Sequence, residues 1–172
     1  MNIPNILTII RLILVPVFLL IFFSNIPNAM LISFIVFAAA GLTDILDGYI
    51  ARKFNLITKW GSILDPLADK LMSIAVLISL TVKHIIPFWV VTIIGLKEFF
   101  MILGAIILYK MGTFVSAKLY GKIATVLFYI SVIFLEIDRT TGLLLLYLTV
   151  AAALFALGKY VENYKNVKHS KL

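Results

Sequence analysis

The chain has 172 residues, of which 63% are apolar and 13% are charged, and its formal net charge is +7. A soluble domain of this length cannot hide so much apolar surface, because a small domain buries only about two-thirds of the surface that its unfolded chain exposes. Composition therefore excludes a soluble globular enzyme and a disordered chain, and it indicates an integral membrane protein. The sequence has no cysteine, which also excludes disulfide scaffolds, thiolate metal sites and cysteine nucleophiles.

The predicted elements are helices, because the apolar runs are long, rich in Leu and Ile, and without alternation of period two. In chain order, the six candidate segments are Leu12–Phe23, Ala29–Ile50, Ile63–Val82, Ile86–Tyr109, Ile123–Leu135 and Leu143–Tyr160. The first segment is short for a full span, and we expect the preceding Asn2–Arg11 to form a helix lying partly in the headgroup region. The prediction is an all-α integral membrane protein of one domain, residues 1–172, with six transmembrane helices and a short N-terminal interfacial helix.

The cations predict the orientation, since cytoplasmic loops carry an excess of Lys and Arg. With a cytoplasmic N-terminus, eleven cations fall on that side: Arg11, Arg52, Lys53, Lys59, Lys110, Lys118, Lys122, Lys159, Lys165, Lys168 and Lys171. The other side carries two, Lys83 and Arg139. We therefore expect a multi-pass protein of the cell membrane with both termini and the active site cytoplasmic. The cations lie at the ends of apolar runs, so we expect no nucleic-acid partner.

Acidic residues are concentrated in one segment. Of the eight in the chain, four lie within 26 residues, at Asp44, Asp47, Asp65 and Asp69. Each pair is three or four residues apart and shares one helix face, and a short loop joins the two helices. Four carboxylates brought together near the membrane repel one another, so a stable arrangement requires divalent cations, and oxygen ligands suit Mg²⁺ or Mn²⁺.

Neighbouring residues fit a phosphate-binding site. Gly48 and Ala51 let a flat base or a pyrophosphate approach the helix closely, and Arg52 can fork onto phosphate oxygens. Gly61 allows a tight entry into the next helix, and Pro66 falls in the first turn of that helix. Any one of these residues is equally consistent with a helix cap or a packing contact. The complete spacing favours a site for a metal and a phosphate.

This spacing, D-x2-D-G-x2-A-R-x8-G-x3-D-x3-D, resembles the signature of the CDP-alcohol phosphatidyltransferases, with every fixed position filled. The resemblance implies a Mg²⁺- or Mn²⁺-dependent transfer, with two ions, of a phosphatidyl group from CDP-diacylglycerol to an alcohol, with release of CMP. It implies metal ligation by Asp44, Asp47 and Asp65, with Asp69 as general base and further candidate ligand. It implies CDP binding by Asp44, Gly48, Ala51, Arg52 and Gly61. It also implies a homodimer in the lipid bilayer.

The acceptor is less strongly specified. The opening Asn2–Arg11 is similar to family members that use sn-glycerol 3-phosphate, which we expect to be the acceptor. The candidate cations for its phosphate are Lys118, Lys122, Arg52 and Lys97. Ala124 and Phe128 depart from the family's G-K-x-K-T-x-x-Q pattern, and Lys97 stands where Arg is usual.

Other readings therefore stay open. The same chemistry can use phosphatidylglycerol, inositol phosphate or serine as acceptor, and a more remote alternative is a divalent-cation transporter.

Overall fold

The structure, a computed structural model, describes residues 3–54, 58, 61–110 and 119–169, without the side chains of 3, 52, 62–63, 104–110, 119–120, 122 and 163–169. The described residues form helices and no strand: α1 (Ile3–Phe22), α2 (Ala29–Lys53), α3 (Gly61–Val82), α4 (Phe88–Lys110), α5 (Leu119–Ile137) and α6 (Arg139–His169). They divide into two compact units, Met1–Ile85 and Ile86–Leu172. The all-helical prediction is confirmed, and each predicted apolar segment corresponds to one helix.

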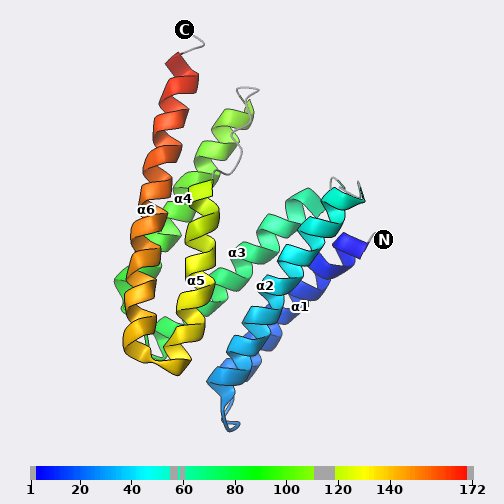
Figure 1. Ribbon diagram of the computed structural model, residues 1–172, viewed down its shortest axis with the longest axis vertical. Helices are drawn as coiled ribbons and strands as arrows, with labels where there is room; N and C mark the ends of the chain where they lie inside the picture. The colour runs from blue at the N-terminus through cyan, green and yellow to red at the C-terminus, as the bar shows by residue number, and fades with distance from the viewer. Residues whose placement is uncertain (1–2, 55–57, 59–60, 111–118, 170–172) are drawn as a thin grey trace. The chain divides into compact units, whose positions relative to one another are not determined.

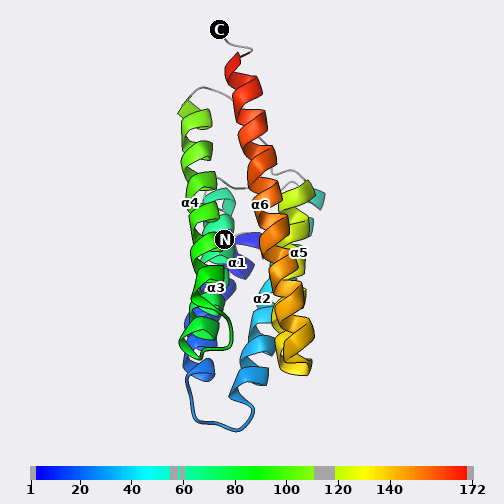
Figure 2. The ribbon, with the colours of Figure 1, turned by 90° about the vertical axis from the view of Figure 1, so that its left-hand side faces the viewer.

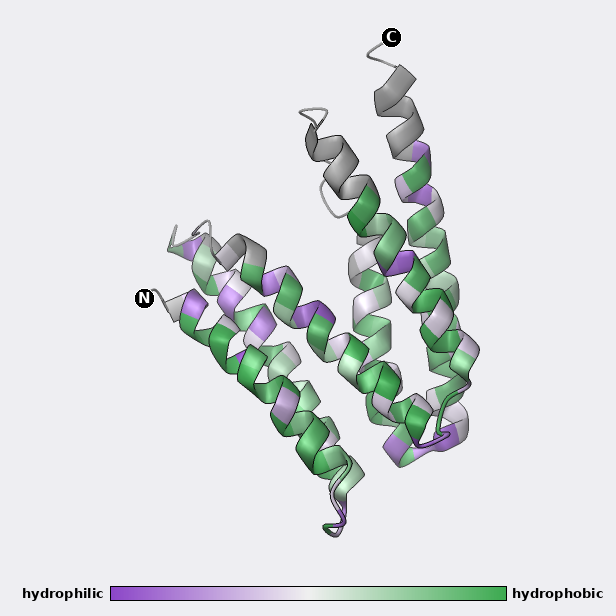
Figure 3. Cartoon of the chain, turned by 180° about the vertical axis from the view of Figure 1, so that it is seen from behind, coloured by the Kyte–Doolittle hydropathy of each residue, from purple (hydrophilic) through white to green (hydrophobic). Residues whose placement is uncertain are grey.

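In the first unit, α1 packs against both α2 and α3 (Figure 1). One end of this unit has an aromatic core, in which the ring centroids of Phe18 and Phe22 lie 5.5 Å apart and those of Phe22 and Phe34 lie 6.3 Å apart. The other end, at the start of α1, is more polar, as the hydropathy colouring indicates (Figure 3). Thr8, Arg11 and Asp47 are buried there. The first unit therefore has an aromatic end, where α1 meets α2, and a polar end at the start of α1.

α1 is one continuous helix of 20 residues, although Pro16 lies inside it. At a rise of 1.5 Å per residue it is about 30 Å long, the thickness of the hydrocarbon layer. The sequence predicts an interfacial segment before Leu12, but the described helix has no break between that segment and the following span.

Local hydrogen bonds explain how α3 ends. The backbone N–H of Ile85 donates to the Leu80 carbonyl and that of His84 to the Thr81 carbonyl, both at 2.9 Å. His84 has a φ of 55°, so it takes the left-handed place that closes a Schellman motif. Pro87 follows and precedes the first residue of α4. Residues 83–87 therefore form a tight turn between α3 and α4.

The prediction for Pro66 is wrong in one respect. Because α3 begins at Gly61, Pro66 is its sixth residue and not part of its first turn. A proline at this position removes a hydrogen bond to the carbonyl four residues earlier.

In the second unit, α6 packs against both α4 and α5 (Figure 2). A single residue, Asp138, separates α5 from α6. Its carboxylate accepts hydrogen bonds from the backbone N–H groups of Thr140, at 3.2 Å, and Thr141, at 3.0 Å. A hydrogen bond from the Thr141 hydroxyl, together with these two backbone bonds, lowers the pKa of Asp138. Asp138 therefore caps the start of α6.

Three described helical segments are long and apolar enough to cross a membrane, Pro4–Phe22, Ala29–Ala51 and Arg139–Glu162. Large apolar side chains are exposed on them, among them Leu20 at 74% and Ile45 at 66%. Water would disfavour such surfaces, whereas lipid chains accommodate them. The fold is that of a membrane protein.

Candidate active site

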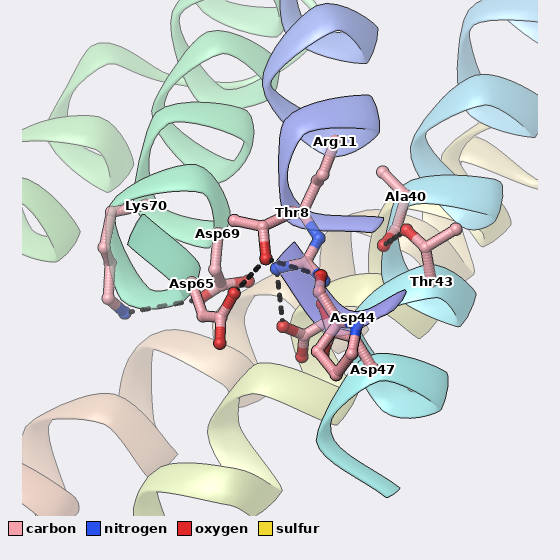
Figure 4. A network of polar contacts seen from close by, with 10 residues as sticks. Thr8, Arg11, Ala40, Thr43, Asp44, Asp47, Asp65, Asp69 and Lys70 are labelled. Atoms are coloured by element: carbon pink, nitrogen blue, oxygen red, sulfur yellow. Dashed lines mark hydrogen bonds and ion pairs between the residues drawn. The ribbon is translucent and has the colours of Figure 1, made fainter. Parts of the chain in front are cut away.

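Arg11 of α1 lies at the centre of the polar end of the first unit (Figure 4). Its Nη1 is 2.8 Å from Asp44 Oδ1, and its Nη2 donates a hydrogen bond to Asp47 Oδ2. The Arg11 side chain is 0% exposed, that of Asp47 is 3% exposed and that of Asp44 is 43% exposed. A buried arginine therefore bridges the two carboxylates that α2 presents on successive turns.

Thr8, one turn before Arg11, connects α1 to α3. Its hydroxyl donates a hydrogen bond to Asp65 Oδ1. The Thr8 hydroxyl oxygen also lies 3.0 Å from the carbonyl oxygen of Pro4. Asp69 follows Asp65 by one turn, and its Oδ2 lies 3.9 Å from Lys70 Nζ. Three of the four predicted aspartates thus contact α1, and Figure 4 shows Asp69 beside them.

A third polar contact of α1 is made by Asn5. The hydroxyl of Thr58 donates to Asn5 Oδ1 at 2.9 Å and accepts from the backbone N–H of Gly61 at 3.0 Å. A Cβ at Gly61 would lie 2.8 Å from Asn5 Oδ1 and 3.0 Å from Thr58 Oγ1. A side chain at the start of α3 would therefore have to push the Asn5 amide or the Thr58 hydroxyl aside and would disturb this contact.

Three other predicted site residues lie on α2, the helix that carries Asp44 and Asp47. Gly48 and Ala51 are half-buried on α2, four and seven residues after Asp44, which places them on its face. Arg52 is the next residue of α2, but its side chain lies outside the described residues, as do Lys118 and the side chain of Lys122.

Lys97 belongs to the second unit. Its ammonium group lies 2.5 Å from Glu98 Oε1, and the residue is only 8% exposed. The sequence places these neighbours about 100° apart on the helix and so predicts different partners for them. That expectation is wrong for Lys97, because its long, flexible side chain bends toward the carboxylate of the next residue, Glu98.

The chemistry of the donors fits a divalent cation. Asp44, Asp47 and Asp65 offer hard carboxylate oxygens from two helices, the ligand type that Mg²⁺ and Mn²⁺ prefer. Arg11 takes one oxygen of Asp44 and one of Asp47 and leaves the second oxygen of each to another partner. Among the described residues, no three Asp, Glu or His side chains form a group closed enough to hold an ion.

Sequence reasoning missed the polar residues of α1 as part of the site. By sequence, Arg11 counts only among the cations of the cytoplasmic side, yet its side chain is buried against two carboxylates. A charged residue inside an apolar run is a signal that could have found it, since such residues are costly in a membrane and usually have a partner. The spacing of Asn5, Thr8 and Arg11, three residues apart, places all three on one face of the helix.

Ionisable residues within membrane helices usually mark a functional site, and sites with two divalent cations occur in enzymes that handle phosphate. The family model for CDP-alcohol phosphatidyltransferases matches residues 1–157. The chain belongs to this family. Its members transfer phosphatidyl groups from CDP-activated donors, and they generally depend on divalent cations.

The chain is similar to several bacterial proteins. One from Bacillus subtilis, named CDP-diacylglycerol–glycerol-3-phosphate 3-phosphatidyltransferase, is 40% identical over 136 residues, covering 72% of this chain and 70% of the relative. A protein of the same name from Wigglesworthia glossinidia brevipalpis is 33% identical over 174 residues, covering 93% of each chain. A third, from Haemophilus influenzae, is 47% identical over 89 residues, covering 52% of this chain and 48% of the relative.

Proposed function

We propose that this protein transfers the phosphatidyl group of CDP-diacylglycerol to sn-glycerol 3-phosphate, forming phosphatidylglycerophosphate and releasing CMP. The observation that carries the proposal is the placement of Asp44, Asp47, Asp65 and Asp69 around one end of the first unit. The names of relatives that span most of this chain support the acceptor.

In this proposal Asp44, Asp47 and Asp65 hold two divalent cations, either Mg²⁺ or Mn²⁺, and Asp69 is a further candidate ligand. When bound, the cations neutralise the pyrophosphate and stabilise the CMP leaving group. Asp69 takes the proton of the acceptor hydroxyl as that oxygen attacks the phosphorus. Gly48, Ala51, Arg52 and Gly61, together with Asp44, hold the CDP moiety.

The fuller membrane arrangement is also part of the proposal. α3, α4 and α5 contain 22, 23 and 19 residues and so extend about 33, 35 and 29 Å, enough to cross the hydrocarbon layer. We propose six spans within one domain, with the active site and both termini on the cytoplasmic side. The family resemblance supports a homodimer.

The function is tested with purified protein in detergent, CDP-diacylglycerol, Mg²⁺ and a panel of acceptors. We expect CMP release with glycerol 3-phosphate and little with free glycerol, inositol phosphate, serine or phosphatidylglycerol. CMP release with another acceptor, and none with glycerol 3-phosphate, would keep the family chemistry and reject this acceptor.

Substitution of the aspartates tests the roles of the individual carboxylates. Asp44→Asn, Asp47→Asn and Asp65→Asn each remove an anionic ligand from a shared site, so each should weaken Mn²⁺ binding and abolish transfer. Asp69→Asn should abolish transfer while CDP-diacylglycerol still binds. Asp138→Asn is the matched control, because Asn also caps a helix and this residue lies in the second unit. Substantial turnover by Asp69→Asn would refute its role as the base.

A further inference from the structure

Among the cations whose side chains the structure describes, Arg11 is unusual because its side chain is 0% exposed and paired with two carboxylates. Nη1 contacts Asp44 and Nη2 contacts Asp47, so the two arms of one guanidinium group reach successive turns of α2. A planar guanidinium can make both contacts at once, whereas a lysine ammonium group acts as a single point of charge. The arrangement fixes the rotation of both carboxylates.

The contacts leave part of each carboxylate available. Arg11 contacts Asp44 Oδ1 and Asp47 Oδ2, which leaves Asp44 Oδ2 and Asp47 Oδ1 for another partner. Thr8 contacts Asp65 through Oδ1 in the same manner and leaves Oδ2. α1 therefore holds three carboxylates from two helices, each by one oxygen.

Displacement of Arg11 by a bound ion would be unfavourable. Within the described residues, Asp44 and Asp47 are its acidic partners, and a buried cation removed from its partners is strongly destabilising. An arginine held in this way can remain in place and orient the carboxylates that bind the ion without binding the ion itself, as residues outside the direct ligand set of a metal do.

We propose that Arg11 is a positioning residue for the transfer reaction. It stays on Asp44 and Asp47 when a divalent cation binds and orients their second oxygens toward that cation, and Thr8 orients Asp65 in the same way. This inference rests on the proposed metal-dependent function and assigns the polar face of α1 to it.

The test measures Mn²⁺ binding to the purified protein in detergent, without CDP-diacylglycerol, from the electron paramagnetic resonance signal of free Mn²⁺. Arg11→Gln should weaken the Mn²⁺ affinity about 10- to 100-fold, the usual effect of losing a residue that orients a metal ligand. Thr8→Val should also weaken it. Thr149→Val is the matched control, because Thr149 is buried and, among the described residues, its hydroxyl donates to the Leu145 carbonyl of its own helix. Its affinity should equal that of the wild type.

The opposite result would overturn the proposal. If Arg11 competes with the cation for the carboxylates, Arg11→Gln will bind Mn²⁺ as tightly as the wild type or more tightly. Arg11→Lys covers the case in which Arg11→Gln does not fold, because it keeps the charge and loses the bridge. Arg11→Lys should bind Mn²⁺ more weakly than the wild type, and wild-type affinity in this variant would also reject the inference.

Measurements of transfer activity distinguish a failure of this inference from a failure of the proposed function. Excess Mn²⁺ should partly restore transfer in Arg11→Lys but not in Asp69→Asn, because added metal cannot replace the general base that Asp69→Asn lacks. A wild-type protein that binds Mn²⁺ but transfers to no acceptor would reject the proposed function and leave the binding test of Arg11 valid. A wild-type protein that binds no Mn²⁺ would reject both.

Discussion

At Gly61, the space for a side chain is taken by Asn5 and Thr58. Gly61→Ala should push Asn5 aside and break the hydrogen bond between Thr58 and Asn5, with a loss of about 0.5–1.5 kcal/mol in the free energy of unfolding. The measurement is thermal unfolding in detergent. Gly95→Ala is the matched control, because no atom in the described part of the chain lies within 4 Å of a Cβ there, and alanine should not destabilise the helix.

A double substitution identifies the cause of the loss at Gly61. If the contact with Asn5 is responsible, Asn5→Ala and Gly61→Ala together should cost little more than Asn5→Ala alone. Additive losses in the double variant would contradict the proposed contact, as would a Gly61→Ala protein that unfolds at the wild-type temperature.

Lys122 tests the acceptor site. If it binds the phosphate of glycerol 3-phosphate, Lys122→Ala should raise the KM for that substrate about ten- to a hundredfold, the equivalent of about 1.5–3 kcal/mol for a charged hydrogen bond. The KM for CDP-diacylglycerol should change far less. Lys83→Ala is the control, since Lys83 is exposed and follows the last residue of α3, at the end of that helix away from the aspartates. Equal effects on both substrates would contradict the assignment.

Individual residues differ in how well the sequence predicts them. The four aspartates are predictable because their spacing fixes which helix faces carry them, and the structure places them at one end of the unit. Arg11 is not predictable as their partner, because the contact joins residues 36 positions apart in the sequence. Such a pairing depends on how α1 packs against α2, which the local pattern does not encode.

At the scale of an element, the connection of α5 and α6 depends on Gly142. A Cβ at this position would lie 2.5 Å from the backbone nitrogen and 2.6 Å from the Cα of Leu135. Backbone atoms cannot rotate away, so Gly142→Ala should force the two helices apart and cost about 1–3 kcal/mol. Gly158→Ala in the same helix is the control, because no atom of the described residues lies within 4 Å of a Cβ added there.

Thermal unfolding and resistance to proteolysis between α5 and α6 would measure this effect. We expect Gly142→Ala to unfold at a lower temperature than both the wild type and Gly158→Ala. Equal stability of the two alanine variants would indicate that the helices can separate at no cost, contrary to the packing described.

Helix boundaries follow from the sequence only in part. The long apolar runs predict all six helices, but α2 extends to Lys53 and α6 to His169, beyond the apolar residues. Polar residues can continue a helix once it has formed, because each added residue gains a hydrogen bond without a new nucleation cost. Hydropathy alone therefore underestimates the lengths of α2 and α6.

For the whole molecule, composition predicts the membrane environment because so many apolar side chains cannot be buried in 172 residues. The exposed apolar faces of α1 and α2 agree with this prediction. The number of spans is harder to derive, since α3 carries Asp65, Asp69 and Lys70 along with its apolar residues. Charges that serve a site lower the hydropathy of the helix that presents them.

Orientation in the membrane is the last prediction. With eleven cations assigned to one side and two to the other, the end of α2 should be cytoplasmic and the end of α3 external. Lys53→Cys and Lys83→Cys report on these two ends, and both native residues are exposed. The native chain has no cysteine, so each variant carries a single thiol.

In intact cells, a membrane-impermeant maleimide should label Lys83→Cys and spare Lys53→Cys. Both variants should react after the membrane is permeabilised, which shows that each thiol is accessible. α3 is about 33 Å long, so the two ends of this helix can lie on opposite sides of the hydrocarbon layer. Labelling of Lys53→Cys from outside intact cells would contradict the orientation and place the aspartates on the wrong side for a cytoplasmic nucleotide substrate.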